Sequence, residues 1–272
     1  MNRIVRPVVL SADMSSPSRS AAVTDRRRPR TSLRALLAVV LLATAGAVPG
    51  GALGATSGYR LDVARQGDFV AQTNLVQCVG ASMQMMLNMT REEDDRTART
   101  QLSLQTLARG LSGQRPDGRE RQGASVRGWS AGLTLLGAGP YRLVGTKTID
   151  EALRLAARSI RETGKPVGLL MWRGRHAWVM SGFKATADPR RTDDFRVTEA
   201  IVLDPLYPRA SKVWGPSPRP REALTVAELG RQFVPRRTGS AASQWLAGLG
   251  GMYVIVMPYH PRELARHQLL AS

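Results

Sequence analysis

The chain has 272 residues and a strongly basic balance, with 39 Lys and Arg against 21 Asp and Glu and a formal net charge of +18. The basic residues are almost all arginine and are scattered, and only 5% of the chain is aromatic, so the clustered basic and stacking side chains of a nucleic-acid-binding protein are missing. This composition excludes nucleic acid as an expected partner, but it allows a weak attraction to an anionic envelope surface.

The first 47 residues are typical of an export segment rather than of a folded domain. An arginine-rich flank ending at Arg34 precedes a short apolar stretch, residues 35–48, and small residues near Ala47 offer a cleavage site. The apolar stretch is shorter than the roughly 20 residues that a spanning helix needs, so we expect a signal peptide and a secreted or cell-envelope protein. An uncleaved N-terminal membrane anchor is the alternative, and a start at Met14 instead of Met1 also stays open.

Cleavage near Ala47 leaves about 225 residues, which is enough for one domain with a substantial core. Residues 1–47 hold eight Arg and two Asp, so the remainder has 31 basic and 19 acidic residues and a net charge of +12. We expect residues 48–58, which are rich in Gly and Ala, to be a flexible linker. Residues 59–258 are expected to form the folded domain, and residues 259–272 a polar tail.

The only cysteine, Cys78, stands directly before an amphipathic run that extends to Met89. If this run is a helix, Cys78 lies at its N-terminus, where the helix dipole and free N–H groups favour a thiolate. An exported chain normally uses cysteine in pairs, so a single cysteine is either a free reactive thiol or the site of an intermolecular bridge. The size of Gln77 and the distance of Cys78 from the apolar stretch argue against lipidation at this position.

Three further helices are expected before the sheet is complete. Apolar residues have helical spacing over residues 102–111 and again over residues 126–136. The next helix is the best defined, because Thr148 and Glu151 form a capping box at its start and Gly164 ends its apolar pattern.

After Gly164 the hydrophobic period changes from that of a helix to that of short strands. The expected strands are residues 166–172, 177–183, 200–203 and 251–258. Before the last of them, Thr225 and Glu228 form a second capping box, which predicts a helix to about Phe233. Helices followed by mostly antiparallel strands predict one α+β domain with two lobes and a site between them.

Three separated motifs carry the residue types of an activated nucleophile. Cys78 supplies a thiol, His176 an imidazole on an apolar strand, and Asp204 a carboxylate at the end of another strand. An imidazole that titrates near neutral pH can take the thiol proton and give it to a leaving amine, and a carboxylate can fix its tautomer. His260 and His267 lie in the tail without partner spacing, so no metal site and no cofactor are expected.

These motifs, in this order, resemble the papain-like cysteine peptidases. More narrowly, they are similar to the peptidase domains of bacteriocin exporters and to their free-standing exported bacterial relatives. The resemblance rests on Gln72 with a cysteine six residues later, on the small residues and the Met- and Leu-rich helix that follow, and on the Gly- and Pro-containing strand at residues 164–170. It also rests on the strand motif that begins at His176 and on the strand that leads to Asp204. It covers roughly residues 60–258, and each motif is weak by itself.

The resemblance implies a papain-like two-lobed fold, in which the cysteine helix packs on a mostly antiparallel sheet. It implies that Cys78 is the nucleophile, that His176 is the general base and then the general acid, and that Asp204 orients the imidazole. Gln72 matches the side-chain donor of the oxyanion hole, which acts together with the backbone N–H of Cys78. Gln77 is a second candidate for the role of Gln72. The implied partner is a peptide or protein substrate.

The function expected from these features is that of an exported thiol hydrolase, a peptidase or amidase that works through an acyl-enzyme at Cys78. Two alternatives stay open: an inert papain-like module that binds or scaffolds, and an acyltransferase in which an amine outcompetes water. Each residue also has an ordinary structural interpretation. Cys78 can be a buried apolar residue, His176 a core histidine, and Asp204 part of a strand-end turn. The oligomeric state is left undetermined.

Overall fold

The computed structural model describes residues 58–114, 118, 121–238 and 248–259. The expected signal peptide and nearly all of the expected linker and tail lie outside these residues, as do His260 and His267. Within the described ranges, no helix has both the length and the apolar character needed to cross a membrane.

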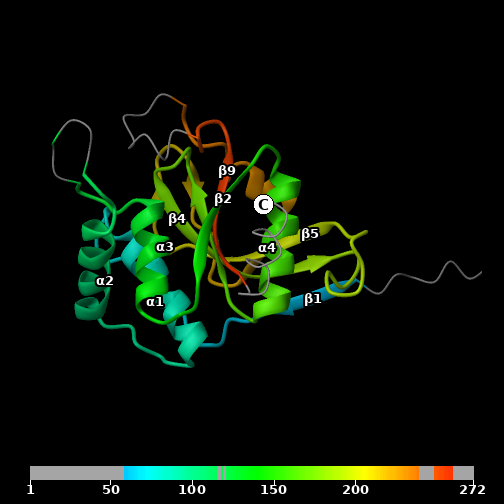
Figure 1. Ribbon diagram of the computed structural model, residues 1–272, viewed down its shortest axis with the longest axis horizontal. Helices are drawn as coiled ribbons and strands as arrows, with labels where there is room; N and C mark the ends of the chain where they lie inside the picture. Colours follow the sequence, from blue (N-terminus) through cyan, green and yellow to red (C-terminus); the bar gives the residue numbers. More distant parts are fainter. Residues whose placement is uncertain (1–57, 115–117, 119–120, 239–247, 260–272) are drawn as a thin grey trace, which may run out of the picture. The chain divides into compact units, whose positions relative to one another are not determined.

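The described residues combine helices with one large sheet (Figure 1). The helices are α1 (Cys78–Arg91), α2 (Ala98–Gly110), α3 (Val126–Leu135), α4 (Ile149–Thr163) and α5 (Val226–Gly230). The strands of the large sheet are β1 (Tyr59–Asp62), β2 (Tyr141–Thr146), β3 (Val167–Met171), β4 (His176–Ala185), β5 (Val197–Leu203), β8 (Glu222–Thr225) and β9 (Tyr253–Pro258). Two short strands, β6 (Ala210–Ser211) and β7 (Gly215–Pro216), pair separately.

The large sheet has the strand order β2-β9-β3-β4-β5-β8, and each of its strand pairs is antiparallel. Strand β1 pairs with residues 182–185 of β4, whereas β3 pairs with residues 176–180. Because β5 occupies the other edge of β4, β1 and β3 follow one another along the same edge. The expectation of an α+β chain with a mostly antiparallel sheet is therefore confirmed.

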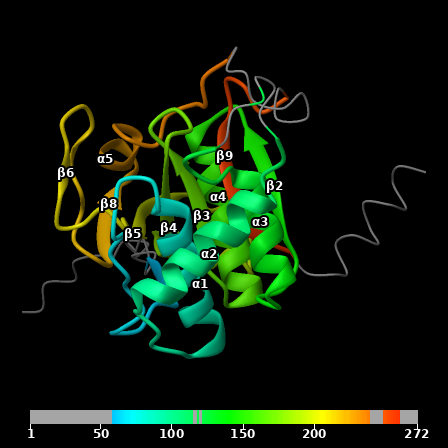
Figure 2. The same ribbon diagram turned by 90° about the vertical axis from the view of Figure 1, so that its left-hand side faces the viewer.

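Both faces of the sheet are covered by helices, which explains why its central strands are apolar throughout. Successive strand residues point to opposite faces. The residues that pack with α1, α2 and α3 on one face include Leu170, Ala177, Val179, Val254 and Val256. The residues that pack with α4 on the other face include Leu169, Trp178, Met180, Ile255 and Met257. Figure 2 looks at the molecule from the side of α1–α3, with the sheet behind them.

The two expected capping signals begin helices, and one of these helices is shorter than expected. At α4 the hydroxyl of Thr148 accepts a bond from the N–H of Glu151, and Gly164 ends the helix in the left-handed conformation. The capping box at α5 is complete, but this helix ends at Gly230 instead of near Phe233. The chain turns there because the N–H groups of Gln232 and Phe233 both donate to the carbonyl of Leu229.

Candidate active site

Cys78 is the first residue of α1, as expected, and its side chain is only partly buried. The residue before the helix, Gln77, makes no side-chain capping bond. Among the residues that the structure describes, none accepts a hydrogen bond from the backbone N–H of Cys78, which is one of the N–H groups that every helix start leaves free. The sulfur therefore lies beside groups that can stabilise negative charge.

A buried glutamine of α2 fixes the start of α1. The side-chain oxygen of Gln105 accepts a bond from the N–H of Gly80 at 2.9 Å, and its NH2 group donates to the carbonyl of Val76 at 2.9 Å. Only glycine fits at position 80, because an added Cβ would lie 2.7 Å from the backbone oxygen of Gln101. The glycine two residues after the cysteine is thus explained by the close approach of α1 to α2.

A second buried glutamine, one helical turn earlier in α2, holds the loop that contains Gln72. The side-chain oxygen of Gln101 accepts a bond from the N–H of Thr73 at 2.8 Å, and its NH2 group donates to the carbonyl of Ala71 at 3.0 Å. Neither glutamine was expected from the sequence to support the site. The one signal for them was their placement four residues apart on the apolar face of α2, where a polar residue needs a partner.

His176 is the first residue of β4, and Asp204 is the first residue after β5. The two side chains meet, since Nε2 of His176 lies 2.7 Å from Oδ1 of Asp204. Both side chains are almost completely buried, with exposed fractions of 4% and 0%. Oδ1 of Asp204 also accepts the N–H of Leu206 at 2.8 Å, which fixes the carboxylate in place.

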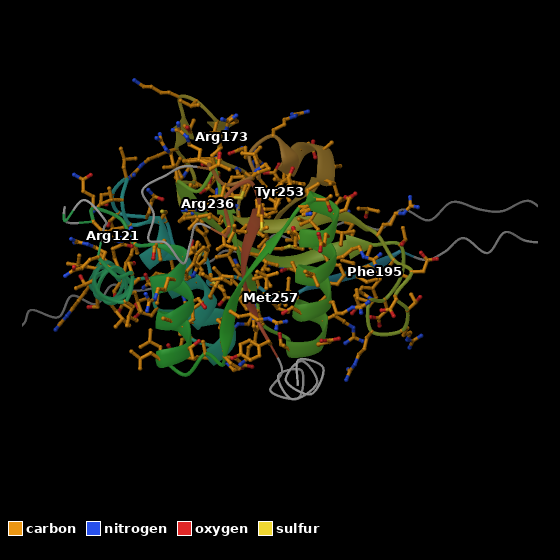
Figure 3. The ribbon with its side chains drawn as sticks, turned by 45° about the horizontal axis from the view of Figure 1, so that its top comes forward. Arg121, Arg173, Phe195, Arg236, Tyr253 and Met257 are labelled. Carbon is orange, nitrogen blue, oxygen red and sulfur yellow. The ribbon has the colours of Figure 1, made fainter. Side chains whose placement is uncertain are left out.

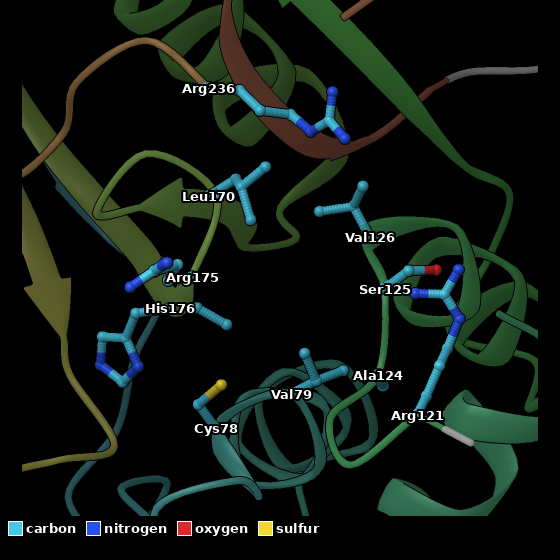
Figure 4. A pocket seen from close by; sticks show the side chains of 12 residues that line it. Cys78, Val79, Arg121, Ala124, Ser125, Val126, Leu170, Arg175, His176 and Arg236 are labelled. Carbon is cyan, nitrogen blue, oxygen red and sulfur yellow. The ribbon is translucent and has the colours of Figure 1, made fainter. Parts of the chain in front are cut away.

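The thiol of Cys78 lies on the other side of the same imidazole. Burial lowers the pKa of His176, but the hydrogen bonds to Asp204 and Cys78 and the negative charges of both groups outweigh it and raise this pKa to about 9. Because Nε2 faces Asp204, Nδ1 is the nitrogen left for the sulfur. Figure 4 shows the side chains of Cys78 and His176 on the same wall of a pocket. The structure thus brings together three of the four expected site residues.

Two hydrogen bonds tie the three motifs to one another. The hydroxyl of Ser82, one turn after Cys78, donates to the carbonyl of Ala177 at 3.2 Å, so α1 is attached to β4 beside the histidine. The backbone N–H of Gln72 donates to the carbonyl of Pro205 at 2.7 Å, so the Gln72 loop is attached to the residue after Asp204. Both bonds restrict the distance between the thiol and the imidazole.

The side chain of Gln72 is buried next to this assembly, but it does not line the pocket beside Cys78. Its NH2 group donates one bond to the carbonyl of Asn74 at 2.8 Å, which leaves the second amide hydrogen for another acceptor. Gln77, the second candidate, does not line the pocket either, and its side-chain oxygen accepts a bond from the hydroxyl of Thr73. The oxyanion role of Gln72 therefore stays a prediction.

A stack of aromatic rings, which was not expected from the sequence, covers the histidine. The ring of Trp172 stacks on the imidazole of His176 with 3.9 Å between ring centroids, and the parallel ring of Trp214 follows at 6.3 Å. The indole N–H of Trp172 donates to the side-chain oxygen of Gln232 at 2.8 Å, which holds the ring in place. The backbone of Trp172 itself has a φ of 55°, in the turn between β3 and β4. A tryptophan in the left-handed region is strained, so the turn holds it there against a conformational cost. The ring shields the imidazole from water, and an aromatic face favours its cationic form.

A pocket of about 160 Å³ opens directly beside the sulfur of Cys78. Its walls come from the start of α1, the segment before α3, the β3–β4 turn and the segment before β9. In the described part of the chain, no three His, Cys, Asp or Glu side chains are arranged to hold a metal ion. The site therefore offers a thiol, a buried imidazole–carboxylate pair and space for a ligand.

The comparisons with known proteins add no family to this geometry. A scan against models of protein families found no match for the chain, and a search among curated proteins found no similar sequence.

Proposed function

We propose that this protein is a thiol hydrolase, a peptidase or amidase that forms an acyl-enzyme at Cys78. One observation carries the proposal: the buried imidazole of His176 bonds to Asp204 through one nitrogen while the thiol of Cys78 lies close enough to raise its pKa. Thiol, imidazole and carboxylate in this order are the parts of an activated nucleophile. The proposal extends to a papain-like fold, with the nucleophile on a helix and the base on the sheet, and to export of the chain.

In the proposed reaction, the thiolate of Cys78 attacks the carbonyl carbon of an amide bond. The backbone N–H of Cys78 and the second amide hydrogen of Gln72 stabilise the oxyanion. The imidazolium of His176 gives its Nδ1 proton to the leaving nitrogen, so the C–N bond breaks and a thioester remains. The neutral imidazole then takes a proton from water, and the hydroxide formed hydrolyses the thioester and restores the starting pair.

The environment of the pair supports a catalytic role over an inert scaffold. Burying a charged pair is expensive, and well-packed apolar residues usually stabilise a core at least as well. Here His176 and Asp204 are both buried, and the strained Trp172 is held against the imidazole. Strained residues and perturbed titratable groups cluster at functional sites. At the same time the thiol of Cys78 remains partly exposed, as a nucleophile requires.

Trapping of the acyl-enzyme tests the proposal. The full chain is incubated with a library of activated peptide esters and amides, and intact-mass spectrometry follows the protein between pH 5 and 9. We expect an acyl adduct on the wild-type chain that water releases with time, and no adduct on Cys78→Ala. An absence of adduct and of cleavage over the whole range would identify an inert module. An adduct that is released only by added amines would identify an acyltransferase.

A further inference from the structure

The pocket beside Cys78 carries positive charge on three sides. Arg121 comes from the segment before α3, Arg175 from the β3–β4 turn, and Arg236 from the segment before β9 (Figure 4). Figure 3 shows Arg121 and Arg236 in the same part of the molecule, well away from Phe195. None of the described residues that line this pocket is an Asp or a Glu.

Two of these arginines are held in position by their surroundings. The aliphatic part of Arg236 lies over the turn, because a Cβ added to Gly174 would meet Cγ of Arg236 at 3.2 Å. The backbone of Arg236 is fixed by bonds to Met252 and from Gly251, both of 2.8 Å. Burial lowers the pKa of Arg236, which indicates that water is partly excluded from its charge. The Nε–H of Arg121 donates to the carbonyl of Gly113 at 2.9 Å.

The remaining walls fit a short aliphatic stem. Val79, Val126 and Leu170 give the pocket apolar sides, and Ser125 adds a hydroxyl group. A pocket of about 160 Å³ has room for several water molecules, and so for a side chain with two methylene groups and a carboxylate. Guanidinium groups match carboxylates in geometry as well as in charge.

We propose that this pocket binds a carboxylate of the substrate next to the bond that is cleaved. The carboxylate belongs either to an Asp or Glu side chain or to the C-terminus of a peptide. The position relative to a cleaved bond rests on the proposed function, whereas the binding of the anion rests on the pocket alone. The substrate class is accordingly that of acidic peptides or of peptides with a free C-terminus.

Two alkylating reagents of equal size test the anion preference without any need for turnover. Iodoacetate and iodoacetamide both alkylate the thiolate of Cys78, which forms an S–C bond to their CH2 carbon as iodide departs, but only iodoacetate carries a charge. The measured quantity is the ratio of their rates at Cys78 in the full chain, divided by the same ratio for glutathione. At low salt we expect this normalised ratio to be about thirtyfold, because each of three charges roughly 6 Å from the reagent contributes about threefold in water, and we expect it to fall as salt is added.

Variants then assign the effect to the pocket. Arg236→Gln and Arg175→Gln should each lower the normalised ratio by about threefold, since each removes one of the three charges. Arg175 is exposed, so its variant folds even if Arg236→Gln is destabilised. Arg190→Gln is the matched control, because Arg190 is exposed in the β4–β5 loop with Phe195 and its loss changes the net charge equally. A wild-type ratio equal to that of glutathione, or an equal fall in Arg190→Gln, overturns the proposal.

Peptides distinguish the two sources of the carboxylate. We compare protection of Cys78 against iodoacetamide by matched peptides that carry a Glu or a Gln side chain, and by peptides with a free or an amidated C-terminus. If the Glu peptide protects Cys78 better than the Gln peptide, the pocket binds a side-chain carboxylate; if the peptide with a free C-terminus protects better than the amidated one, it binds the C-terminal carboxylate. Equal protection within both pairs contradicts the inference. Failure of the proposed function gives a different result. In that case neutral iodoacetamide reacts with Cys78 no faster than with glutathione, whatever the ratio between the rates of iodoacetate and iodoacetamide.

Discussion

Replacing Asp204 by asparagine removes the negative charge beside His176 and nearly preserves the shape of the side chain. Oδ1 of Asp204 accepts bonds from Nε2 of His176 at 2.7 Å and from the N–H of Leu206 at 2.8 Å. The carbonyl oxygen of an asparagine can accept both bonds, so the main loss is the charge. We therefore expect Asp204→Asn to fold and to lower the pKa of His176 from its value of about 9.

The size of the effect follows from linkage between protonation and folding. A rise of the His176 pKa from 6.5 to about 9 corresponds to about 3 kcal/mol at about 1.4 kcal/mol per pKa unit. Because the pKa is raised in the folded state, this stabilisation is fully present below pH 6.5 and is lost as the pH rises through about 9. The bond to Asp204 is the largest of the effects that raise the pKa. We therefore expect asparagine to remove at least about 1 kcal/mol of this stabilisation.

Urea unfolding, followed by tryptophan fluorescence at pH 6 and pH 9.5, measures this stabilisation. His176→Gln supplies the reference, because it keeps the pH dependence of every other group. The free energy of unfolding should fall between the two pH values by about 3 kcal/mol more in the wild type than in His176→Gln, with Asp204→Asn between them. The same comparison in a Cys78→Ala background removes the contribution of the sulfur and leaves that of Asp204. Identical pH dependence in wild type and His176→Gln would refute the reasoning, since His176 would then not be charged in the folded protein.

Three further predictions concern the stacked ring, the oxyanion donor and export. Trp172→Ala should lower kcat and shift the alkaline limb of the pH profile of kcat to lower pH, because the imidazole loses its aromatic cover. Trp172→Phe should retain the wild-type kcat and pH profile, and equal behaviour of the two variants would show that the ring does not act on His176. Gln72→Ala should lower kcat/KM by about 100-fold if its amide stabilises the oxyanion, and an unchanged value would transfer that role to Gln77 or to the backbone alone. N-terminal sequencing of the exported chain should find a start between residues 46 and 56, and a full-length chain held in the membrane would favour the anchor.

Local features of the site were predictable because their signals are local. The free helix start at Cys78, the strand that carries His176 and the strand end before Asp204 follow from short runs of residue types and from the change of period after Gly164. The capping of α4 by Thr148 was likewise visible, since all of its partners lie within four residues.

Features that depend on distant partners were not predictable in the same way. The strand β2 was not expected, because its mixed residues pair only with β9, more than a hundred residues later in the chain. Gln101 and Gln105 read as ordinary polar residues of a helix until the loop before Cys78 is placed against them. The stacking of Trp172 on the imidazole depends on a turn in which two residues that are not glycines, Trp172 and Arg173, adopt the left-handed conformation, so the sequence carries no sign of it.

The pH profile of alkylation at Cys78 tests the central claim most directly. Iodoacetamide is reacted with the full chain and with His176→Ala between pH 5 and 9, and the modified residue is identified by peptide mass spectrometry. The account predicts that at pH 6 the wild-type chain reacts faster than a free thiol, whose pKa is about 8.5, because the imidazolium of His176 stabilises the thiolate. His176→Ala should lose most of this advantage, and Gln72→Ala should keep it, since an oxyanion donor acts on the carbonyl and not on the sulfur. Profiles of wild type and His176→Ala that coincide from pH 5 to 9 would contradict the account.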